Sequence, residues 1–119
     1  AEYVVLACPL TETTRGLVDA EALKTMRSDA VLINVARGPI VDTDALVSSL
    51  RNSRIRGAAL DVTDPEPLPE DHPLWGLGNA TITPHNAGHT PHYYDRVADI
   101  LAGNLPRLDD GEELENRVV

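Results

Sequence analysis

The stretch AVLINVARGP, residues 30–39, decides the fold of this chain. It begins as a short apolar run, Ala30 to Val35, and passes at once into a turn marked by Gly38 and Pro39. A short apolar run bounded by turn residues is typical of a strand that is buried on both faces, as in a parallel sheet. The stretch therefore predicts an α/β fold, with Arg37 in the loop that follows one of its strands.

Further elements are predicted on both sides of this strand. Two helices begin at aspartates, which commonly cap helix N-termini: Asp19 opens a helix over residues 19–26, and Asp42 opens the next. Short apolar strands are expected at residues 3–7, 57–62 and 80–83. The order strand, helix, strand, helix, strand, loop, strand predicts a parallel sheet with right-handed crossovers and flanking helices.

A last helix is expected near the C-terminus. Thr90 is a capping residue and Pro91 suits the first helical position, so we predict a helix that runs from there to about Leu101. Gly103 is expected to end this helix. The acidic tail, Asp109 to Val119, is predicted to be irregular.

Composition bounds the class of protein. The chain has 119 residues, enough for one domain with a modest core. Its 10 basic and 19 acidic residues give a formal charge of −9, which argues against general nucleic-acid binding. We expect no membrane partner and no secretion, because the sequence has no run of about 18 apolar residues and no basic, hydrophobic leader. The single cysteine, Cys8, excludes an internal disulfide and fits a cytoplasmic location.

The basic residues are unusual in composition, because Lys24 is the only lysine and the others are arginines. An acid-rich, lysine-poor composition resembles proteins of halophilic organisms, whose carboxylate surfaces stay solvated where salt screening is strong. An ordinary acidic protein from a GC-rich genome is the alternative interpretation.

Three chemically useful side chains follow three of the predicted strands. Arg37 lies just after the strand quoted above. Glu66 follows the strand over 57–62, and His85 follows the strand over 80–83. The carboxyl ends of parallel strands meet at one edge of the sheet, where ligands of open α/β sheets bind. A cation, a carboxylate and an imidazole at this edge suit the reduction of a carbonyl beside a carboxylate.

Each residue of this trio also has a simpler interpretation when it is taken alone. An arginine after a strand is usually a surface residue, Glu66 lies in an acidic, proline-rich loop, and a histidine can cap a strand end. The joint arrangement favours the active-site interpretation. The other histidines carry no comparable motif, so we expect them to be structural or exposed: His72, His89 and His92. No ligand cluster supports a metal site.

Six segments together carry the pattern of a known family. They are CPLT at 8–11, residues 34–42, residues 59–67, HPLW at 72–75, residues 79–88 and NRVV at 116–119. In order and spacing they resemble the D-isomer-specific 2-hydroxyacid dehydrogenases, which include D-lactate, glyoxylate/hydroxypyruvate and phosphoglycerate dehydrogenases. The match runs over nearly the whole chain.

The resemblance implies a domain organisation. Residues 1–90 would be the second half of an NAD(P)-binding domain, the C-terminal half of a Rossmann-like sheet, and residues 91–119 the return helix and tail of a substrate domain. In this family the glycine-rich phosphate-binding motif lies upstream. Because the chain also begins inside a strand without an initiator methionine, we expect it to be part of a longer protein. Alone it should bind dinucleotide weakly and turn over nothing.

The resemblance also implies a role for each residue of the trio. Arg37 would bind the substrate carboxylate and 2-oxo group, because a guanidinium presents two parallel donors and stays charged. His85 would protonate the carbonyl oxygen as hydride arrives. Glu66 would hydrogen-bond the other imidazole nitrogen, fix the tautomer and favour the imidazolium form.

The cofactor implied by the resemblance is NAD or NADP. Cys8 and Pro9 would lie along the nicotinamide ribose with Thr11 near, and Asp61 would approach the carboxamide. The complete set of implied cofactor-binding residues is Cys8, Pro9, Thr11, Val35, Ala36, Arg37, Asp61, His85, Ala87 and Gly88.

Two classes of function fit the resemblance. The first is an NAD(P)-dependent oxidoreductase for small 2-oxo and D-2-hydroxy acids, of the phosphoglycerate or glyoxylate/hydroxypyruvate type and homodimeric as the longer enzyme. The second is an NAD(H)-sensing, corepressor-like binding protein of the same family. The acidic surface and the short tail after the last helix favour the enzyme.

Overall fold

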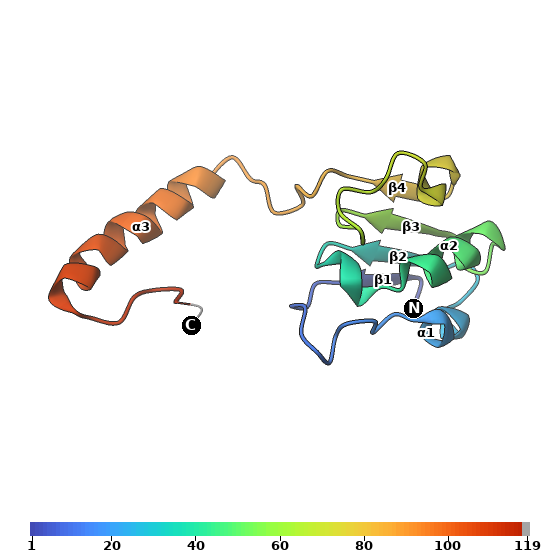
Figure 1. Ribbon diagram of the computed structural model, residues 1–119, viewed down its shortest axis with the longest axis horizontal. Coiled ribbons are helices and arrows are strands. Elements are labelled where there is room, and N and C mark those ends of the chain that lie inside the picture. Colours follow the sequence, from blue (N-terminus) through green and yellow to red (C-terminus); the bar gives the residue numbers. More distant parts are fainter. Residues whose placement is uncertain (118–119) are drawn as a thin grey trace. The chain divides into compact units, whose positions relative to one another are not determined.

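The computed structural model describes residues 1–117, and the chain divides into two compact units, Ala1–Ala87 and Gly88–Val119 (Figure 1). Val118 and Val119, which end the NRVV segment, lie outside the described residues. The two units are described separately below.

The first unit is built on one four-stranded parallel sheet in the order β1-β2-β3-β4. The strands are β1 (Tyr3–Leu6), β2 (Val31–Asn34), β3 (Gly57–Leu60) and β4 (Ala80–Ile82). The parallel α/β prediction is confirmed, and each strand ends one or two residues earlier than predicted. The loops at the carboxyl ends therefore begin at Ala7, Val35, Asp61 and Thr83.

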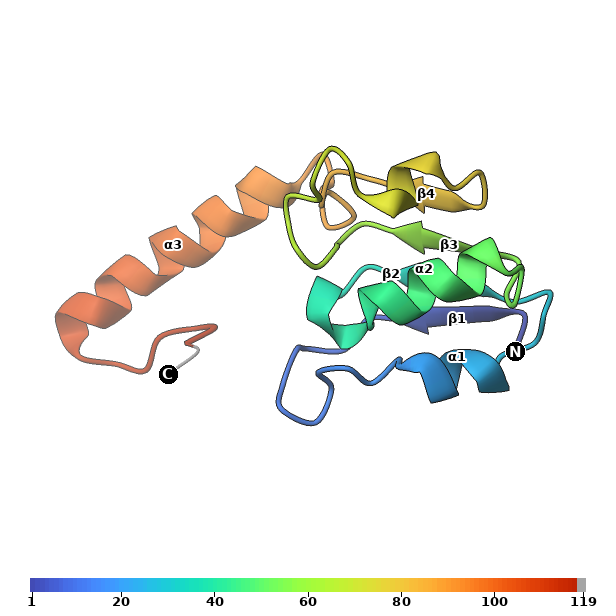
Figure 2. The ribbon, with the colours of Figure 1, turned by 45° about the vertical axis from the view of Figure 1, so that its right-hand side comes forward.

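Two helices follow the first two strands, α1 (Ala20–Thr25) and α2 (Thr43–Arg51). Asp19 and Asp42 cap them as predicted, because their carboxylates accept hydrogen bonds from the backbone N–H groups of Ala22 and Ala45. Both helices lie on the same face of the sheet (Figures 1 and 2). This is the arrangement expected when consecutive right-handed crossovers step in one direction across a sheet.

The core lies between the sheet and these helices. Alternate strand residues such as Leu32 and Leu60 are buried there, against Leu23 of α1 and Leu46 and Leu50 of α2. Strand residues on the opposite face are more exposed, for example Val5, which is 57% exposed. Within the described residues, no helix of the first unit covers this second face. The prediction that strands are buried on both faces therefore holds for one face only.

Two short 3₁₀ helices shape the loops, η1 (Gly38–Ile40) after β2 and η2 (Pro73–Gly76) before β4. His72 caps η2, because its Nδ1 accepts a hydrogen bond from the backbone N–H of Leu74, which is buried. This histidine is structural, as expected.

The second unit contains one long helix, α3 (Tyr93–Asp110). The predicted end at Gly103 is wrong: the helix continues through this residue and ends at Gly111, whose φ of 70° is left-handed. A glycine inside a helix costs only about 1 kcal/mol, so it weakens the helix without ending it. The start is also shifted, because Thr90 forms a turn with His92 and Tyr93 before the helix begins.

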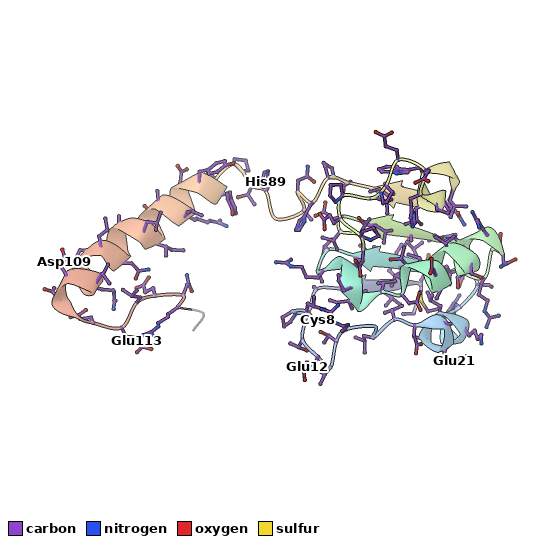
Figure 3. All side chains as sticks on the ribbon, in the orientation of Figure 1. Cys8, Glu12, Glu21, His89, Asp109 and Glu113 are labelled. Atoms are coloured by element: carbon purple, nitrogen blue, oxygen red, sulfur yellow. The ribbon has the colours of Figure 1, made fainter. Side chains whose placement is uncertain are left out.

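The acidic tail folds back on α3. Asn104 exchanges two hydrogen bonds with the backbone of Glu115, and Arg107 lies 3.8 Å from the Glu112 carboxylate and 3.3 Å from that of Glu115. Figure 3 labels Asp109 and Glu113 on either side of the turn. Asp109 and Asp110, predicted to be irregular, are thus helical, whereas residues 112–117 form no helix or strand.

No residue of α3 is buried. Exposed apolar side chains follow one another along it at Val97, Leu101, Leu105 and Leu108. Among the residues described, no helix has the length and apolar character needed to cross a membrane.

Candidate active site

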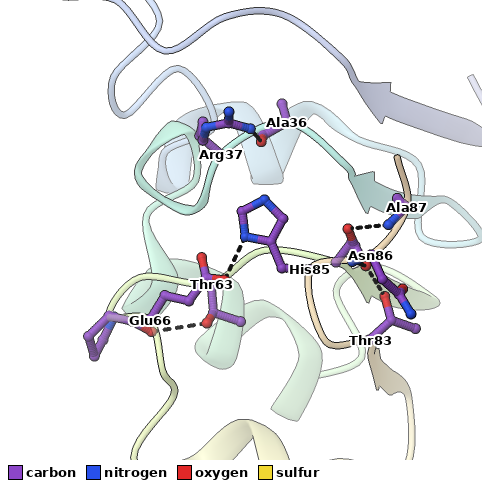
Figure 4. Close-up of polar contacts among 10 residues, drawn as sticks. Ala36, Arg37, Thr63, Glu66, Thr83, His85, Asn86 and Ala87 are labelled. Carbon is purple, nitrogen blue, oxygen red and sulfur yellow. Dashed lines mark hydrogen bonds and ion pairs between the residues drawn. The ribbon is translucent and has the colours of Figure 1, made fainter. Parts of the chain in front are cut away.

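Three loops at the carboxyl ends of neighbouring strands carry the predicted trio (Figure 4). Arg37 follows β2, Glu66 follows β3 and His85 follows β4. The structure brings Glu66 and His85 into direct contact, with 2.7 Å between Glu66 Oε1 and His85 Nδ1. Because a carboxylate only accepts hydrogen bonds, Nδ1 carries the proton in this pair.

The imidazole is held in place but accessible. The side chains of His85 and Glu66 are 47% and 41% exposed. In Figure 4 the ring lies between Glu66 and Arg37, with Nδ1 toward the carboxylate. No hydrogen bond to the second ring nitrogen, Nε2, forms within the described part of the chain. This nitrogen can therefore meet a ligand.

The backbone of His85 adopts an unusual conformation. Its φ of 52° lies in the left-handed region, which costs a residue other than glycine roughly 1–2 kcal/mol. The next two residues are anchored, because the Asp61 carboxylate accepts hydrogen bonds from the backbone N–H groups of Asn86 (3.0 Å) and Ala87 (2.8 Å). Thr83 Oγ1 donates a third bond to Asp61, at 2.6 Å. Asp61 thus holds the loop that presents His85.

Asp61 remains ionised despite its burial. Burial alone would raise the pKa of this carboxyl, but the hydrogen bonds from Thr83, Ala87 and Asn86, together with the nearby His85, outweigh burial. The pKa of Asp61 therefore lies below its usual range. A negative charge at this position is a fixed part of the site.

The loop of Arg37 is anchored by Asn34, the last residue of β2. The Asn34 side-chain amide donates to the carbonyl of Arg37 (3.0 Å), and its oxygen accepts from the N–H of Ala36 (3.0 Å). The guanidinium of Arg37 is exposed and donates to the carbonyl of Ala36 at 2.6 Å. The backbone of this loop is therefore fixed, while the charged end of the side chain can turn to another acceptor.

Asn34 and Thr83 are supporting residues to which the sequence analysis gave no role. Asn34 is only 1% exposed. The sequence could have indicated its role, because a buried polar residue at the end of an apolar strand needs a hydrogen-bond partner. The bond from Thr83 to Asp61 joins residues 22 positions apart, so no local pattern could reveal it.

A hollow of about 250 Å³ opens on the uncovered face of the sheet, at the carboxyl ends of β2, β3 and β4. Three residues of the predicted cofactor set line it, Val35, Asp61 and Ala87. Its remaining walls are mainly apolar or small: Ile33, Ala59, Leu60, Thr81, Thr83 and Asn86. A mainly apolar hollow with the buried carboxylate of Asp61 among its lining residues fits a planar, polar-edged ring such as nicotinamide.

The rest of the predicted cofactor set lies outside this hollow. Cys8 lies in the loop that follows β1 (Figure 3). Threonines hold this loop together: Thr14 Oγ1 donates to the carbonyl of Pro9, and the backbone N–H of Thr11 donates to Thr14 Oγ1. Gly88 is the first residue of the second unit. Ala36 and Arg37 belong to the loop after β2 described above.

A second hollow, of about 270 Å³, lies beside the Glu66–His85 pair. The exposed indole of Trp75 lines it and is fixed by a hydrogen bond from Nε1 to the carbonyl of Pro69, at 2.8 Å. The other lining residues include Leu68 and Ile82. Within residues 1–117, no group of three or more histidine, cysteine or acidic side chains could hold a metal ion.

A parallel α/β sheet with a histidine–carboxylate pair and an arginine at its carboxyl edge is compatible with the class of dinucleotide-dependent oxidoreductases. The family comparison is more specific. Residues 1–87 match the family model described as "D-isomer specific 2-hydroxyacid dehydrogenase, NAD binding domain". The chain belongs to the D-isomer-specific 2-hydroxyacid dehydrogenase family. The match to an NAD-binding domain also confirms the predicted class of cofactor, NAD or NADP.

Individual relatives are similar to this chain over nearly its whole length. The chain is 46% identical over 118 residues to an uncharacterised Corynebacterium melassecola protein, covering 99% of this chain and 39% of the relative. It is 45% identical over 112 residues to a glyoxylate reductase from Thermofilum pendens, covering 94% of this chain and 33% of the relative. The chain therefore spans about two fifths or less of these relatives' length.

A solved structure extends the likeness to three dimensions. A D-isomer-specific 2-hydroxyacid dehydrogenase from Xanthobacter autotrophicus, crystallised with NADPH, superimposes with a TM-score of 0.88 at 43% identity. The alignment covers 100% of this chain and 48% of that one. The Rossmann-like fold class predicted from the sequence is thus confirmed.

Proposed function

We propose that this chain supplies the catalytic residues of an NAD(P)-dependent dehydrogenase that interconverts 2-oxo acids and D-2-hydroxy acids. One observation carries the proposal: His85 Nδ1 is bonded to Glu66 at 2.7 Å, which leaves Nε2 available on the side of the ring turned away from Glu66 (Figure 4). An orienting carboxylate, a general acid and a cation are the groups that reduction of a 2-oxo acid requires.

His85 acts as the proton donor in the reductive direction. With Nδ1–H bonded to Glu66, the protonated ring presents its second proton on Nε2 to the carbonyl oxygen of the substrate. As the proton moves to oxygen, the ring becomes neutral and keeps the Nδ1–H tautomer that Glu66 selects. In the oxidative direction the neutral ring removes the hydroxyl proton.

Arg37 binds the carboxylate of the substrate. Its guanidinium already donates to a single carbonyl oxygen, that of Ala36, at 2.6 Å. A carboxylate offers two charged acceptors in place of one neutral acceptor, and it therefore draws the guanidinium away. This places the 2-oxo carbon next to the imidazole.

The dinucleotide, when bound, supplies or accepts the hydride at the substrate carbon. Val35, Asp61 and Ala87 would hold the nicotinamide end in the hollow on the uncovered face of the sheet. Cys8, Pro9 and Thr11 would lie along its ribose, and Gly88 would leave room for the ring. Reduction consumes one hydride at carbon and one proton from His85 at oxygen, so the product is the 2-hydroxy acid.

Glyoxylate and hydroxypyruvate are the proposed substrates, because one relative that covers 94% of this chain is named glyoxylate reductase and another, from Arabidopsis thaliana and 41% identical, is named glyoxylate/hydroxypyruvate reductase. We further propose that activity belongs to a longer protein, since the chain spans only a third of the first relative's length. Residues 1–90 would complete a dinucleotide-binding domain, and residues 91–119 would join a substrate domain.

The test is a substrate panel with the full-length protein that contains this chain. Glyoxylate, hydroxypyruvate, pyruvate and phosphohydroxypyruvate are incubated with NADH or NADPH at low and high salt, and absorbance is followed at the reduced nicotinamide band. We expect substrate-dependent loss of absorbance, fastest with glyoxylate or hydroxypyruvate. Tight NADH binding without turnover of any 2-oxo acid would instead favour the nucleotide-sensing function.

A further inference from the structure

Gly38 lies against the backbone of a neighbouring loop. A Cβ atom at this position would lie 1.9 Å from the carbonyl oxygen of Thr63, 2.2 Å from its carbon and 2.8 Å from the nitrogen of Asp64. The φ of Gly38 is not in the left-handed region, so its conformation does not require glycine. Only the close approach of the two backbones does.

The contact joins two of the three catalytic loops. Gly38 directly follows Arg37, and Thr63 precedes Glu66 by three residues. A second link lies beside it, because Thr43 Oγ1 donates a hydrogen bond to the carbonyl of Asp64, at 2.9 Å. We call the set Gly38, Thr43, Thr63 and Asp64 the loop clamp.

The space next to the loop clamp is too small to accommodate an added side chain at Gly38. The void lined by all four of its residues measures only about 10 Å³. This is at the lower limit of the roughly 10–15 Å³ that one water molecule needs. A methyl group at Gly38 can therefore be accommodated only if the two loops move apart.

We propose that the loop clamp sets the spacing between Arg37 and the Glu66–His85 pair. With this spacing a single 2-oxo acid binds the guanidinium through its carboxylate and meets the imidazole through its carbonyl oxygen. The four residues are positioning residues. The inference rests on the function proposed above and adds a determinant of substrate geometry to it.

The separation of the two loops that Gly38→Ala requires is large enough to lower the rate of catalysis. Ordinary contact begins at 3.4 Å, against 1.9 Å at Gly38, so the Gly38→Ala variant must separate the loops by roughly 1.5 Å. A misplacement of about 1 Å can lower a rate 100-fold. Losing the Thr43 bond removes one link but creates no clash, so its effect is smaller.

A second glycine provides a structural control. A Cβ atom at Gly57 would lie 2.9 Å from the carbonyl oxygen of Asn79, also a backbone clash, but at the amino end of β3, away from the three loops. Gly78 has no atom within 4 Å of its would-be Cβ and serves as a neutral control. For the Thr43 hydroxyl the control is Thr25, whose Oγ1 bonds only within α1, to Ala22.

The experiment measures steady-state reduction of the preferred 2-oxo acid by the full-length protein, corrected for the folded fraction. We expect Gly38→Ala to lower kcat/KM about 100-fold and Thr43→Val about 10-fold, mainly by raising KM for the oxo acid. Thr43→Ser should restore the wild-type value. Gly57→Ala should lower the melting temperature while changing kcat/KM less than about 3-fold, and Gly78→Ala and Thr25→Val should change neither by much. The pH at which the rate falls should stay the same in the clamp variants, because Glu66 and His85 are intact.

The inference is overturned if the clamp variants lose no more kcat/KM than Gly57→Ala, Gly78→Ala and Thr25→Val. Should Gly38→Ala fail to fold, Thr43→Val and its serine rescue decide alone. A wild-type protein that reduces no 2-oxo acid would contradict the proposed function instead. The clamp is then judged by isothermal titration with oxamate, a carboxylate-bearing analogue of a 2-oxo acid, and equal affinity in wild type and Thr43→Val would overturn it.

Discussion

The loops of His85 and Arg37 present their side chains in different ways. His85 is fixed twice, through the bonds of Asp61 to the backbone of the next two residues and through Glu66 on its ring. Arg37 has an anchored backbone, but within residues 1–117 its guanidinium bonds only to the neighbouring Ala36 carbonyl. The proton donor is thus preorganised, while the cation is left to follow the substrate.

Because His85 is the preorganised proton donor, we expect its substitution to lower kcat more than any other substitution in the site. In the full-length protein, His85→Gln removes the proton donor, and we expect kcat to fall about 1,000-fold, within the range of general acid catalysis. Affinity for NADH, measured by fluorescence titration, should fall far less than kcat. A variant with kcat within 10-fold of wild type would show that another group supplies the proton.

At Arg37 we expect the loss to appear mainly in KM. Arg37→Lys keeps the positive charge but loses the two parallel donors, so kcat/KM for glyoxylate should fall about 100-fold with a smaller change in kcat. Steady-state kinetics at several substrate concentrations separates the two. An equal fall in kcat and kcat/KM would mean that Arg37 acts only in the transition state and is not the binding group.

Glu66→Gln should have an intermediate effect and a distinct signature. An amide still hydrogen-bonds Nδ1 but no longer favours the charged ring, so the decline of the reductive rate at high pH should move to lower pH. We expect kcat at neutral pH to fall about 10-fold. A pH–rate profile in the same position as that of wild type would reject the orienting role of Glu66.

At Asp61 the expected loss is followed through stability rather than through rate. Asp61→Asn replaces a charged acceptor of three hydrogen bonds, and its amide NH₂ faces backbone donors, so unfolding free energy should fall by roughly 1.5–3 kcal/mol. Urea denaturation of both proteins measures the difference. An unchanged midpoint would show that the carboxylate contributes nothing to the loop.

The difference in unfolding free energy between wild type and Asp61→Asn depends on pH, and the lowered pKa of Asp61 sets the direction of this dependence. The stabilisation that the Asp61 carboxylate provides is complete above the pKa of this group in the unfolded chain, near pH 4. It is lost as pH falls through the lower pKa of the group in the folded protein. The gap between wild type and Asp61→Asn should therefore narrow only in acid, below about pH 4.

The parts of this architecture that depend on local pattern were accessible from the sequence. Apolar runs bounded by turns predicted the four parallel strands, and Asp19 and Asp42 were correctly placed as helix caps. The end of α3 was not predictable from Gly103, because the helix tolerates this residue and the tail bonds to Asn104 and Arg107 instead.

In the candidate site, the strand order was enough to place Arg37, Glu66 and His85 on neighbouring loops. The bonds that hold these loops were not predictable, because they join distant residues, as Thr43 does with Asp64 and Thr83 with Asp61. The close approach at Gly38 depends on the path of two backbones, and no side-chain pattern reports it.

Isotope transfer tests whether hydride passes to a 2-oxo acid with His85 as the proton donor. The full-length protein is incubated with hydroxypyruvate and NADH, or NADPH, that carries deuterium at both C4 positions of the nicotinamide, and the product is analysed by mass spectrometry and chiral chromatography. We expect a D-2-hydroxy acid with one deuterium at C2, formed about 1,000-fold more slowly by His85→Gln. A product without deuterium, a product of L configuration, or equal rates in the two proteins would contradict this expectation.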